Sequence, residues 1–228
     1  MDKKSTVMIG EKISSKNKID LDKPEVKVLF YRNDLFYISL NQNSWETGYK
    51  KCLEHHISNR PYFSPISIHP RIARAMVNLS NCDKNETVID PFCGTGGILI
   101  EGADMGLKII GIDLKEKMIE YTKGNLKHYG FKGQLKNSDF DKINSFNFDS
   151  IVCDPPYGIA STSGGENISD LMNRCLGEFQ KSMLKKQRLV IAVSNPELIR
   201  NQNLTLLKKF EWYIHKSLTR YVMVLEKN

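Results

Sequence analysis

Residues 87–97 read TVIDPFCGTGG, and the fold of this chain is predicted from this pattern. A short apolar strand over 87–90 ends on Asp90, a glycine-rich turn follows, and a helix over 97–105 ends at Gly106. The alternation continues on both sides, with helices predicted over 70–80, 115–128 and 168–184 and strands over 108–112, 133–136, 149–153 and 189–194. Strands that alternate with helices are typical of a doubly wound parallel sheet, so the predicted fold class is α/β and Rossmann-like.

The loop after Asp90 differs in its chemistry from a dinucleotide-binding loop. Its glycine spacing is G-x-G-G, and Leu99 stands where the third glycine of G-x-G-x-x-G would be. Asp90 occupies the strand end that a pyrophosphate would approach, and no Gly-Lys-Ser/Thr follows, which excludes a P-loop. A cofactor with an ammonium and a sulfonium would instead gain from the carboxylate, while Gly94 and Gly96 let the backbone come close. S-adenosylmethionine fits this description.

Two further acids follow the next two strands. Asp113 ends the strand over 108–112, 19 positions after Gly94, near the offset of about 20 residues at which an acid meets ribose hydroxyls. Asp139 follows the third strand, and we expect it to hydrogen-bond an adenine amine while Phe140 packs on the face of the base. An ordinary loop Asp is the alternative for Asp139.

Residues 154–158, Asp-Pro-Pro-Tyr-Gly, follow the apolar run over 150–153. Two prolines after an acid make a stiff turn, which holds a carboxylate, the Pro155 carbonyl and the Tyr157 ring in fixed relation. The ring offers a stacking face, and the two acceptors suit the two hydrogens of an exocyclic amine. This pattern favours an amino-methylating active site. The alternative is a tight turn whose Tyr packs.

Composition excludes several classes of protein. The chain has 228 residues, 40% hydrophobic and 26% charged, and no apolar run reaches the roughly 20 residues of a membrane helix. The polar start lacks a secretory signal, so we expect a cytosolic protein without a membrane partner. Five cysteines without a C-x-x-C pair argue against a disulfide framework or a zinc site, and we expect no metal. His55, His56 and His128 are interpreted as structural or surface residues.

The net charge of +7 is unevenly distributed along the chain. Residues 1–60 carry +3, residues 61–160 carry −1 and residues 161–228 carry +5. Basic flanks around a neutral middle suit a polyanion held at the periphery of a site for a cationic cofactor. General solubility explains the charge equally well.

Both ends of the chain predict β-hairpins. The first joins residues 24–30 to 35–40, and the second joins residues 211–215 to 221–225. Because two strands are marginal alone, we expect the first hairpin to belong to a larger sheet whose other part lies upstream. Residues 41–66 are polar and contain Gly48, Pro61 and Pro65, which predicts a linker. We therefore place one domain over 1–45 and a Rossmann-like methyltransferase domain over 46–228.

The combination of DPFCGTGG at 90–97 and DPPYG at 154–158 resembles the archaeal tRNA methyltransferases that modify the exocyclic amine of guanine 10. The resemblance includes RPYF at 60–63, HP at 69–70 and HKSLTR at 215–220. It implies a class I S-adenosylmethionine-dependent fold and a tRNA substrate. Such enzymes usually carry an N-terminal THUMP domain that docks tRNA, and residues 1–45 resemble its last piece. We expect this chain to bind the cofactor but to methylate tRNA poorly unless a THUMP-containing polypeptide is supplied in trans.

The resemblance also implies roles for individual residues. The catalytic set comprises Asp154, Pro155, Pro156 and Tyr157, and the cofactor-binding set comprises His69, Asp90, Cys93, Gly94, Thr95, Gly96, Asp113, Leu114, Asp139 and Phe140. A purely structural helix cap is the alternative for His69 with Pro70. Glu166 is a candidate for closing over the base, against a merely mobile loop. Arg220 is a candidate for contacting phosphate or the guanine edge, against a solvated arginine.

Three alternatives to the tRNA assignment stay open at this point. The same Asp-Pro-Pro-Tyr turn serves guanine amines in ribosomal RNA and adenine amines in DNA. A DNA enzyme would need its own target-reading region, for which this chain leaves no room. A non-catalytic RNA-binding module is an alternative of another class, and the acids Asp90, Asp113 and Asp154 at strand ends argue against it.

Overall fold

The computed structural model describes residues 27–33, 35–41, 49–65, 67–156, 167–199, 203–215 and 218–228, and the chain divides into two compact units, residues 1–50 and 51–228. In the first unit, β1 (Lys27–Asn33) and β2 (Leu35–Asn41) form an antiparallel hairpin. The hairpin predicted near the N-terminus is therefore confirmed, with its first strand starting later than expected.

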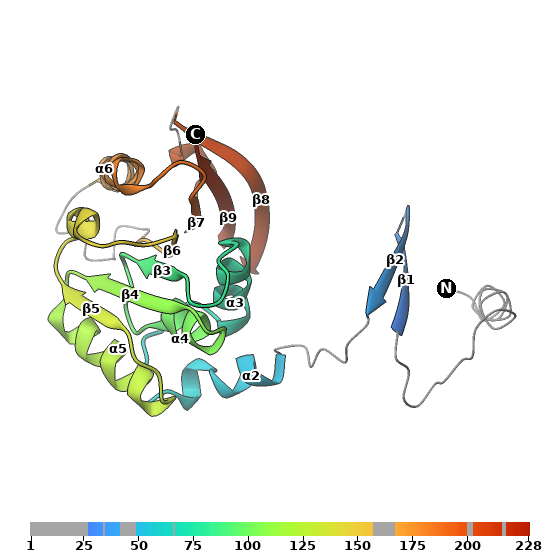
Figure 1. The fold of residues 1–228 in the computed structure, drawn as a ribbon, viewed down its shortest axis with the longest axis horizontal. Coiled ribbons are helices and arrows are strands. Elements are labelled where there is room, and N and C mark those ends of the chain that lie inside the picture. The colour runs from blue at the N-terminus through green and yellow to red at the C-terminus, as the bar shows by residue number, and fades with distance from the viewer. Residues whose placement is uncertain are drawn as a thin grey trace, which may run out of the picture. The chain divides into compact units, whose positions relative to one another are not determined.

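The second unit is built on a seven-stranded sheet of order β5-β4-β3-β6-β7-β9-β8 (Figure 1). The first five strands in this order are parallel, and β9 runs antiparallel to both of its neighbours. The bounds are β3 Thr87–Asp90, β4 Lys108–Asp113, β5 Gln134–Asn137, β6 Ser150–Cys153, β7 Arg188–Val193, β8 Leu204–His215 and β9 Leu218–Lys227. The predicted doubly wound sheet is confirmed, with an antiparallel pair added at one edge.

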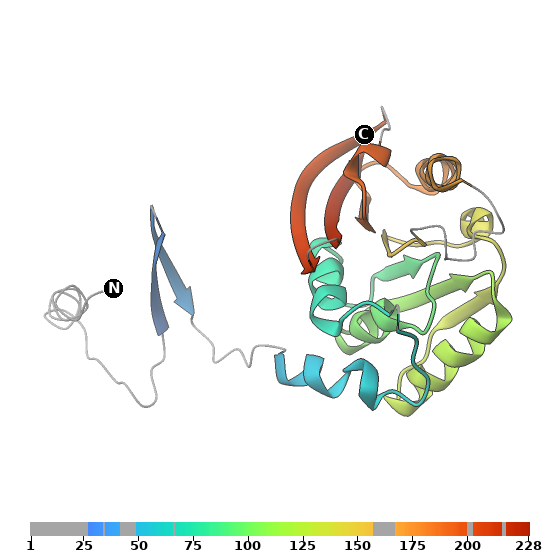
Figure 2. The ribbon, with the colours of Figure 1, turned by 180° about the vertical axis from the view of Figure 1, so that it is seen from behind.

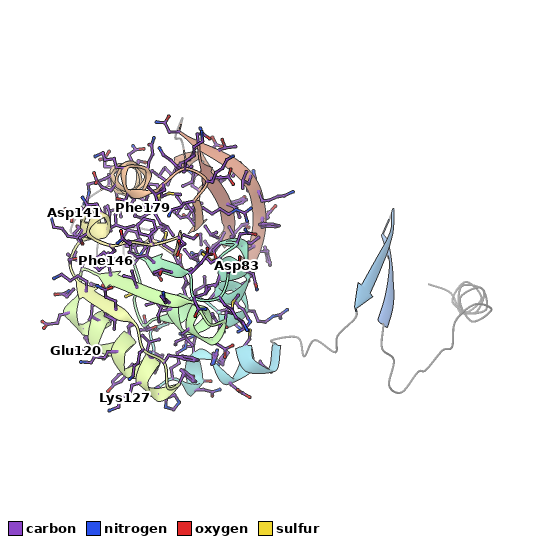
Figure 3. The ribbon with its side chains drawn as sticks, in the orientation of Figure 1. Asp83, Glu120, Lys127, Asp141, Phe146 and Phe179 are labelled. Atoms are coloured by element: carbon purple, nitrogen blue, oxygen red, sulfur yellow. The ribbon has the colours of Figure 1, made fainter. Side chains whose placement is uncertain are left out.

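Helices cover both faces of this sheet (Figures 1 and 2). One face packs α6 (Ile168–Ser182) and the 3-10 helix η2 (Phe140–Ser145), and the other packs α3 (Pro70–Leu79), α4 (Gly97–Asp104) and α5 (Glu116–His128). Figure 3 labels Phe146 and Phe179, which belong to the first layer, and Glu120 and Lys127, which are exposed on α5.

The four central strands, β3, β4, β6 and β7, are apolar in their middles and polar only at their ends, because both faces of the sheet are covered. Successive residues of a strand point to opposite faces. Accordingly, Ile89 and Ile151 pack with α6, whereas Val88 and Val152 pack with α3. Residues of all four central strands are almost wholly buried.

The topology places the carboxyl ends of β3 and β6 side by side. From β3 the chain adds β4 and β5 on one side, and from β6 it adds β7 on the other. Ligands of such sheets bind outside the strand ends at this switch point. Asp90 ends β3 and Asp154 follows β6, so the fold brings the two acids to the same place.

The prediction of a linker over residues 41–66 is wrong from residue 49 onward. This segment contains α2 (Tyr49–Glu54) and the 3-10 helix η1 (Ile57–Asn59). His55 and Arg60 are buried, and the His55 Nδ1 lies 2.9 Å from Glu101 Oε1 of α4. The segment packs on α4 through buried polar side chains. The sequence prediction missed it because it relied on the spacing of apolar residues, which buried polar residues do not produce.

The C-terminal hairpin is longer than predicted. Its first strand, β8, begins at Leu204 instead of residue 211. The missed part contains Lys208 and Lys209, and residues 205–210 of it are exposed at the sheet edge, where charged side chains are common and alternation is weak. Among the described residues, every helix is too short or too polar to cross a bilayer.

Candidate active site

The loop between β3 and α4 is a tight turn formed around Asp90. This carboxylate is 2% exposed, and its Oδ1 accepts a hydrogen bond from the Phe92 N–H at 3.0 Å. Gly94 and Gly96 have φ angles of 52° and 84°, in the left-handed region that glycine tolerates. The turn closes through the Gly96 N–H, which donates to the Cys93 carbonyl at 2.7 Å.

Asp113, at the end of β4, ties this loop to the neighbouring strand. Its Oδ2 accepts from the Gly94 N–H and its Oδ1 from the Lys115 N–H, both at 2.9 Å. Burial raises the pKa of Asp113, and the two backbone donors oppose that rise. In this structure Asp113 orders the glycine loop.

Two buried residues of α5 hydrogen-bond to the loop between β3 and α4. Thr122 donates to the Gly94 carbonyl at 2.7 Å, and Asn125 donates to the carbonyls of Thr95 and Tyr62 at 2.9 and 2.7 Å. Asn125 also accepts from the Tyr62 N–H at 3.0 Å. These two residues were missed from the sequence, because a Thr and an Asn inside a helix look like ordinary polar positions there.

Asp154 follows β6 and forms an ion pair with Arg220 of β9. The Arg220 Nη2 donates to Asp154 Oδ1, and the two side chains are 4% and 13% exposed. Burial raises the pKa of Asp154, and the guanidinium of Arg220 opposes this rise by its charge and its hydrogen bond. The alternative of a solvated Arg220 is therefore wrong, since Arg220 is buried and paired with Asp154.

A cavity of about 100 Å³ lies between the two acids. Asp90 and Asp154 both line it, together with Cys93, Gly94 and Thr95 of the loop. The remaining lining residues are Ser64, Ser67, Ile68, Phe92, Gly97, Ile98 and Met118. The cavity thus joins the predicted cofactor loop to the predicted catalytic turn.

Residues 58–213 match the family model of the RMKL-like methyltransferase domain. A probable tRNA (guanine(10)-N2)-dimethyltransferase of Methanothermococcus thermolithotrophicus is 42% identical over 168 residues, which are 69% of this chain and 98% of that protein. The chain therefore belongs to the family of the RMKL-like methyltransferase domain.

A second relative is longer than this chain. The tRNA (guanine(10)-N2)-dimethyltransferase of Methanothermobacter thermautotrophicus is 35% identical over 179 residues, which are 74% of this chain but 52% of that enzyme. The enzyme of the same name from Pyrococcus abyssi is 35% identical over 229 residues, 96% of this chain and 68% of that enzyme. The chain therefore spans about half to two thirds of the length of these two relatives.

Solved structures show the same fold. TrmN from Thermus thermophilus has a TM-score of 0.65 at 20% identity, covering 96% of this chain and 66% of that one. A methyltransferase from Pyrococcus furiosus has a TM-score of 0.58 at 16% identity, covering 79% of this chain and 95% of that one. The predicted class I methyltransferase fold is confirmed.

The cavity of this methyltransferase domain fits the charge of S-adenosylmethionine. Burial raises the pKa of Asp90 well above its usual range, and the charges of Asp154 and Asp113 raise it further against the opposing Phe92 N–H. A buried carboxylate whose neighbouring charges are negative favours a cationic ligand. Gly94 and Gly96 allow close backbone approach beside it.

The other predicted cofactor residues differ in their surroundings. His69 caps α3, its Nδ1 accepting from the Arg71 N–H at 3.2 Å, and its neighbours Ser67 and Ile68 line the cavity. Leu114 is 64% exposed beside Asp113. The contact predicted for either residue with a cofactor stays a prediction.

Asp139 and Phe140 are linked through Arg174 of α6. The Arg174 Nη1 lies 3.2 Å from Asp139 Oδ1, and its guanidinium stands 4.3 Å from the centre of the Phe140 ring. Phe140 is 4% exposed and packs in the core beside Phe92 and Phe179. The structure shows a packing role for Phe140, and its contact with adenine stays a prediction.

The catalytic turn is described as far as Pro156. Pro155 is buried, and with Ile168, Met172 and Val193 it lines a small second cavity between α6 and β7. Tyr157, and Glu166 in the predicted closing loop, lie outside the described residues. All five cysteines are free, and four of them are buried.

Proposed function

We propose that this chain transfers a methyl group from S-adenosylmethionine to the exocyclic amine of guanine in tRNA, at the position 10 named for its relatives. The observation that carries the proposal is that Asp90 and Asp154 line one cavity in a domain of this family. The Asp90 carboxylate suits a cationic methyl donor, and the Asp154 carboxylate suits an amine that donates hydrogen bonds. A cytoplasmic location goes with a tRNA substrate.

The loop residues divide the binding of the cofactor among them. Asp90 supplies a carboxylate for the cationic end of the cofactor. Gly94 and Gly96 have no side chains, so the cofactor can approach the backbone closely there. Asp113 is proposed to hydrogen-bond the ribose hydroxyls, and Asp139 is proposed to hydrogen-bond the adenine amine. When bound, S-adenosylmethionine supplies a methyl group activated by its sulfonium.

The turn after β6 prepares the amine of the substrate. The nitrogen is a poor nucleophile because its lone pair is delocalised into the guanine ring. Asp154 and the Pro155 carbonyl accept its two hydrogens and favour a pyramidal nitrogen, whose lone pair then faces the methyl group. Tyr157 is proposed to stack on the base, which must first be unstacked from the RNA. The carboxylate of Asp154 is also proposed to take the proton that the methylated nitrogen releases.

We further propose that residues 1–45 are the end of a THUMP-like RNA-binding domain. The first unit of the chain contains the β1–β2 hairpin, and the alignment covers 52% of the Methanothermobacter thermautotrophicus relative. On this proposal the methyltransferase domain performs the chemistry, and efficient docking of tRNA needs a THUMP-containing polypeptide in trans.

The test uses labelled S-adenosylmethionine and an unmodified tRNA transcript, with and without a separately expressed THUMP domain. Nuclease digestion and mass spectrometry then map the product. Methylguanosine at position 10 that forms chiefly with the added domain supports both proposals. Efficient methylation by the chain alone would refute the need for a partner.

The same assay includes ribosomal RNA and DNA as competing substrates, and a tRNA transcript with adenine at position 10 as a matched control. Label in ribosomal RNA or DNA but none in tRNA would move the assignment to those substrates. No transfer to any nucleic acid, with no binding of S-adenosylhomocysteine, would favour a non-catalytic RNA-binding module.

A further inference from the structure

Arg220 is a buried cation at the edge of the active site. It is 3% exposed, and it reaches from the third residue of β9, near the start of that strand, to the carboxylate of Asp154. Its strand partner is Trp212 of β8, and the guanidinium carbon lies 5.1 Å from the centre of the Trp212 ring. Arg220 is therefore held from one side by an aromatic ring and from the other by an acid.

Stability alone does not explain this pair. A buried ion pair must repay the desolvation of two charges, and replacing it with apolar residues of similar volume is often neutral or stabilising. Here the acid also lines the cavity together with Asp90, whose pKa is raised by the charge of Asp154. The pair lies where the charge state of a carboxylate affects chemistry.

We propose that Arg220 is a positioning residue for methyl transfer: it binds Oδ1 of Asp154, keeps the carboxylate charged and directs Oδ2 toward the exocyclic amine of the base. The inference rests on the proposed function and adds a residue to it. A protonated Asp154 would present a hydroxyl in place of an acceptor, and an unheld one would rotate away from the amine. Trp212 fixes the guanidinium in turn.

The groups that face Asp154 fix the direction of the expected pH effect. Arg220 of β9 favours the carboxylate by its charge and its hydrogen bond, whereas burial disfavours it. The charge of Asp154 in turn raises the pKa of Asp90 of β3 and of the Cys153 thiol of β6. Removing Arg220 therefore raises the pKa of Asp154. Because transfer needs the ionised acid, the acid limb of the activity profile moves to higher pH.

The experiment compares Arg220→Leu and Arg220→Lys in the full chain with its THUMP partner. Arg188→Leu is the control, because Arg188 is a partly buried arginine of the adjacent β7 that donates to the Leu79 carbonyl. We expect Arg220→Leu to lower kcat at pH 7 by about a hundredfold and to raise the acid limb by about one to three pH units. Lysine should restore the position of the limb but only part of kcat, since it lacks the planar fork of arginine.

Two further readouts separate positioning from folding. Affinity for S-adenosylhomocysteine should stay within a few fold in all three variants, and Arg188→Leu should leave the acid limb in place even if it lowers Tm. Carboxyl ¹³C NMR, with Asp154 identified by the loss of its signal in Asp154→Asn, reports its pKa without any substrate.

A raised Asp154 pKa in Arg220→Leu, together with the shifted limb, supports the inference. An unchanged Asp154 pKa, or an unchanged limb with wild-type kcat, overturns it. If the wild-type chain methylates no nucleic acid, the proposed function fails, and the NMR titration still decides whether Arg220 keeps Asp154 charged.

Discussion

Asp90 and Asp154 share a cavity but have different electrostatic neighbours. Asp90 faces other acids and one backbone N–H, whereas Asp154 is paired with Arg220. Acids whose surroundings differ in this way commonly have different roles. We infer that Asp90 serves a cationic ligand and that Asp154 serves as a charged hydrogen-bond acceptor.

Replacing Asp154 with Asn should lower kcat by about 10²–10³-fold, because it removes a charged acceptor aimed at the reacting amine. Affinity for S-adenosylhomocysteine, measured by calorimetry, should stay within a few fold. Asp149→Asn is the matched control, since Asp149 caps the opposite end of the sheet by accepting from the Thr87 N–H at 2.7 Å. Near-wild-type turnover by Asp154→Asn would refute its role.

Replacing Asp90 with Asn should weaken binding of S-adenosylmethionine and remove the pH dependence of that binding. The raised pKa of Asp90 means that the carboxylate gains its charge as pH rises, so wild-type affinity should rise with pH. A raised folded-state pKa also means that stability falls as pH rises from the unfolded value toward the folded one. At pH 7, Asp90→Asn should therefore stabilise the ligand-free chain by about 1 kcal/mol. Denaturant unfolding and calorimetry check both effects, and a destabilised variant with unchanged affinity would contradict them.

The glycine loop depends on its neighbour α5 for its conformation. Thr122 and Asn125 hold the carbonyls of Gly94 and Thr95, and Asn125 also fixes the backbone of Tyr62. The loop is thereby coupled to the segment that lines the cavity through Ser64 and Ser67. An ordered loop binds a ligand without first losing conformational freedom.

Gly96→Ala tests the loop against a matched glycine. Gly96 has φ of 84°, and an added Cβ would stand 3.0 Å from the Thr122 Cγ2, whereas Gly130 has φ of 75° and nothing within 4 Å of its Cβ. Both alanines should cost about 1–2 kcal/mol of stability in backbone strain. Gly96→Ala should cost more and should weaken cofactor affinity, and Gly130→Ala should not affect affinity. Equal effects of the two variants in both measurements would contradict this account.

The molecule as a whole combines a methyltransferase domain with basic flanks. The net charge is +7, and residues 161–228 carry +5 of it. Two compact units, 1–50 and 51–228, suit a division between RNA docking and chemistry. Under the proposed function the basic flanks contact the phosphates of tRNA, whereas the central segment that contains Asp90 and Asp154, residues 61–160, is close to neutral.

Binding of tRNA should weaken as salt rises, because each contact with a phosphate releases counterions. Between 50 and 200 mM salt we expect log K to fall linearly with log salt. S-adenosylhomocysteine affinity is the internal control and should change little. A flat response for tRNA would show that the basic flanks do not contact phosphate.

The sequence alone predicted the alternating strands and helices and the glycine loop. It also predicted the positions of Asp90 and Asp154 at strand ends, because all of these features depend on local patterns and short spacings. It misassigned α2 and the start of β8, where buried polar groups or an exposed edge replace a hydrophobic period.

Only the tertiary structure showed the pairing of Asp154 with Arg220, 66 residues apart, and of Tyr62 with Asn125, 63 residues apart. Such contacts depend on the sheet order and on strand register, which a linear pattern does not encode. The structure also buried Phe140, because the packing of α6 on the sheet determines which side chains the core encloses. The sequence thus predicts which chemical groups follow each strand. The residues that determine the charge of Asp154 or hold the glycine loop are identified only by the packing of distant segments.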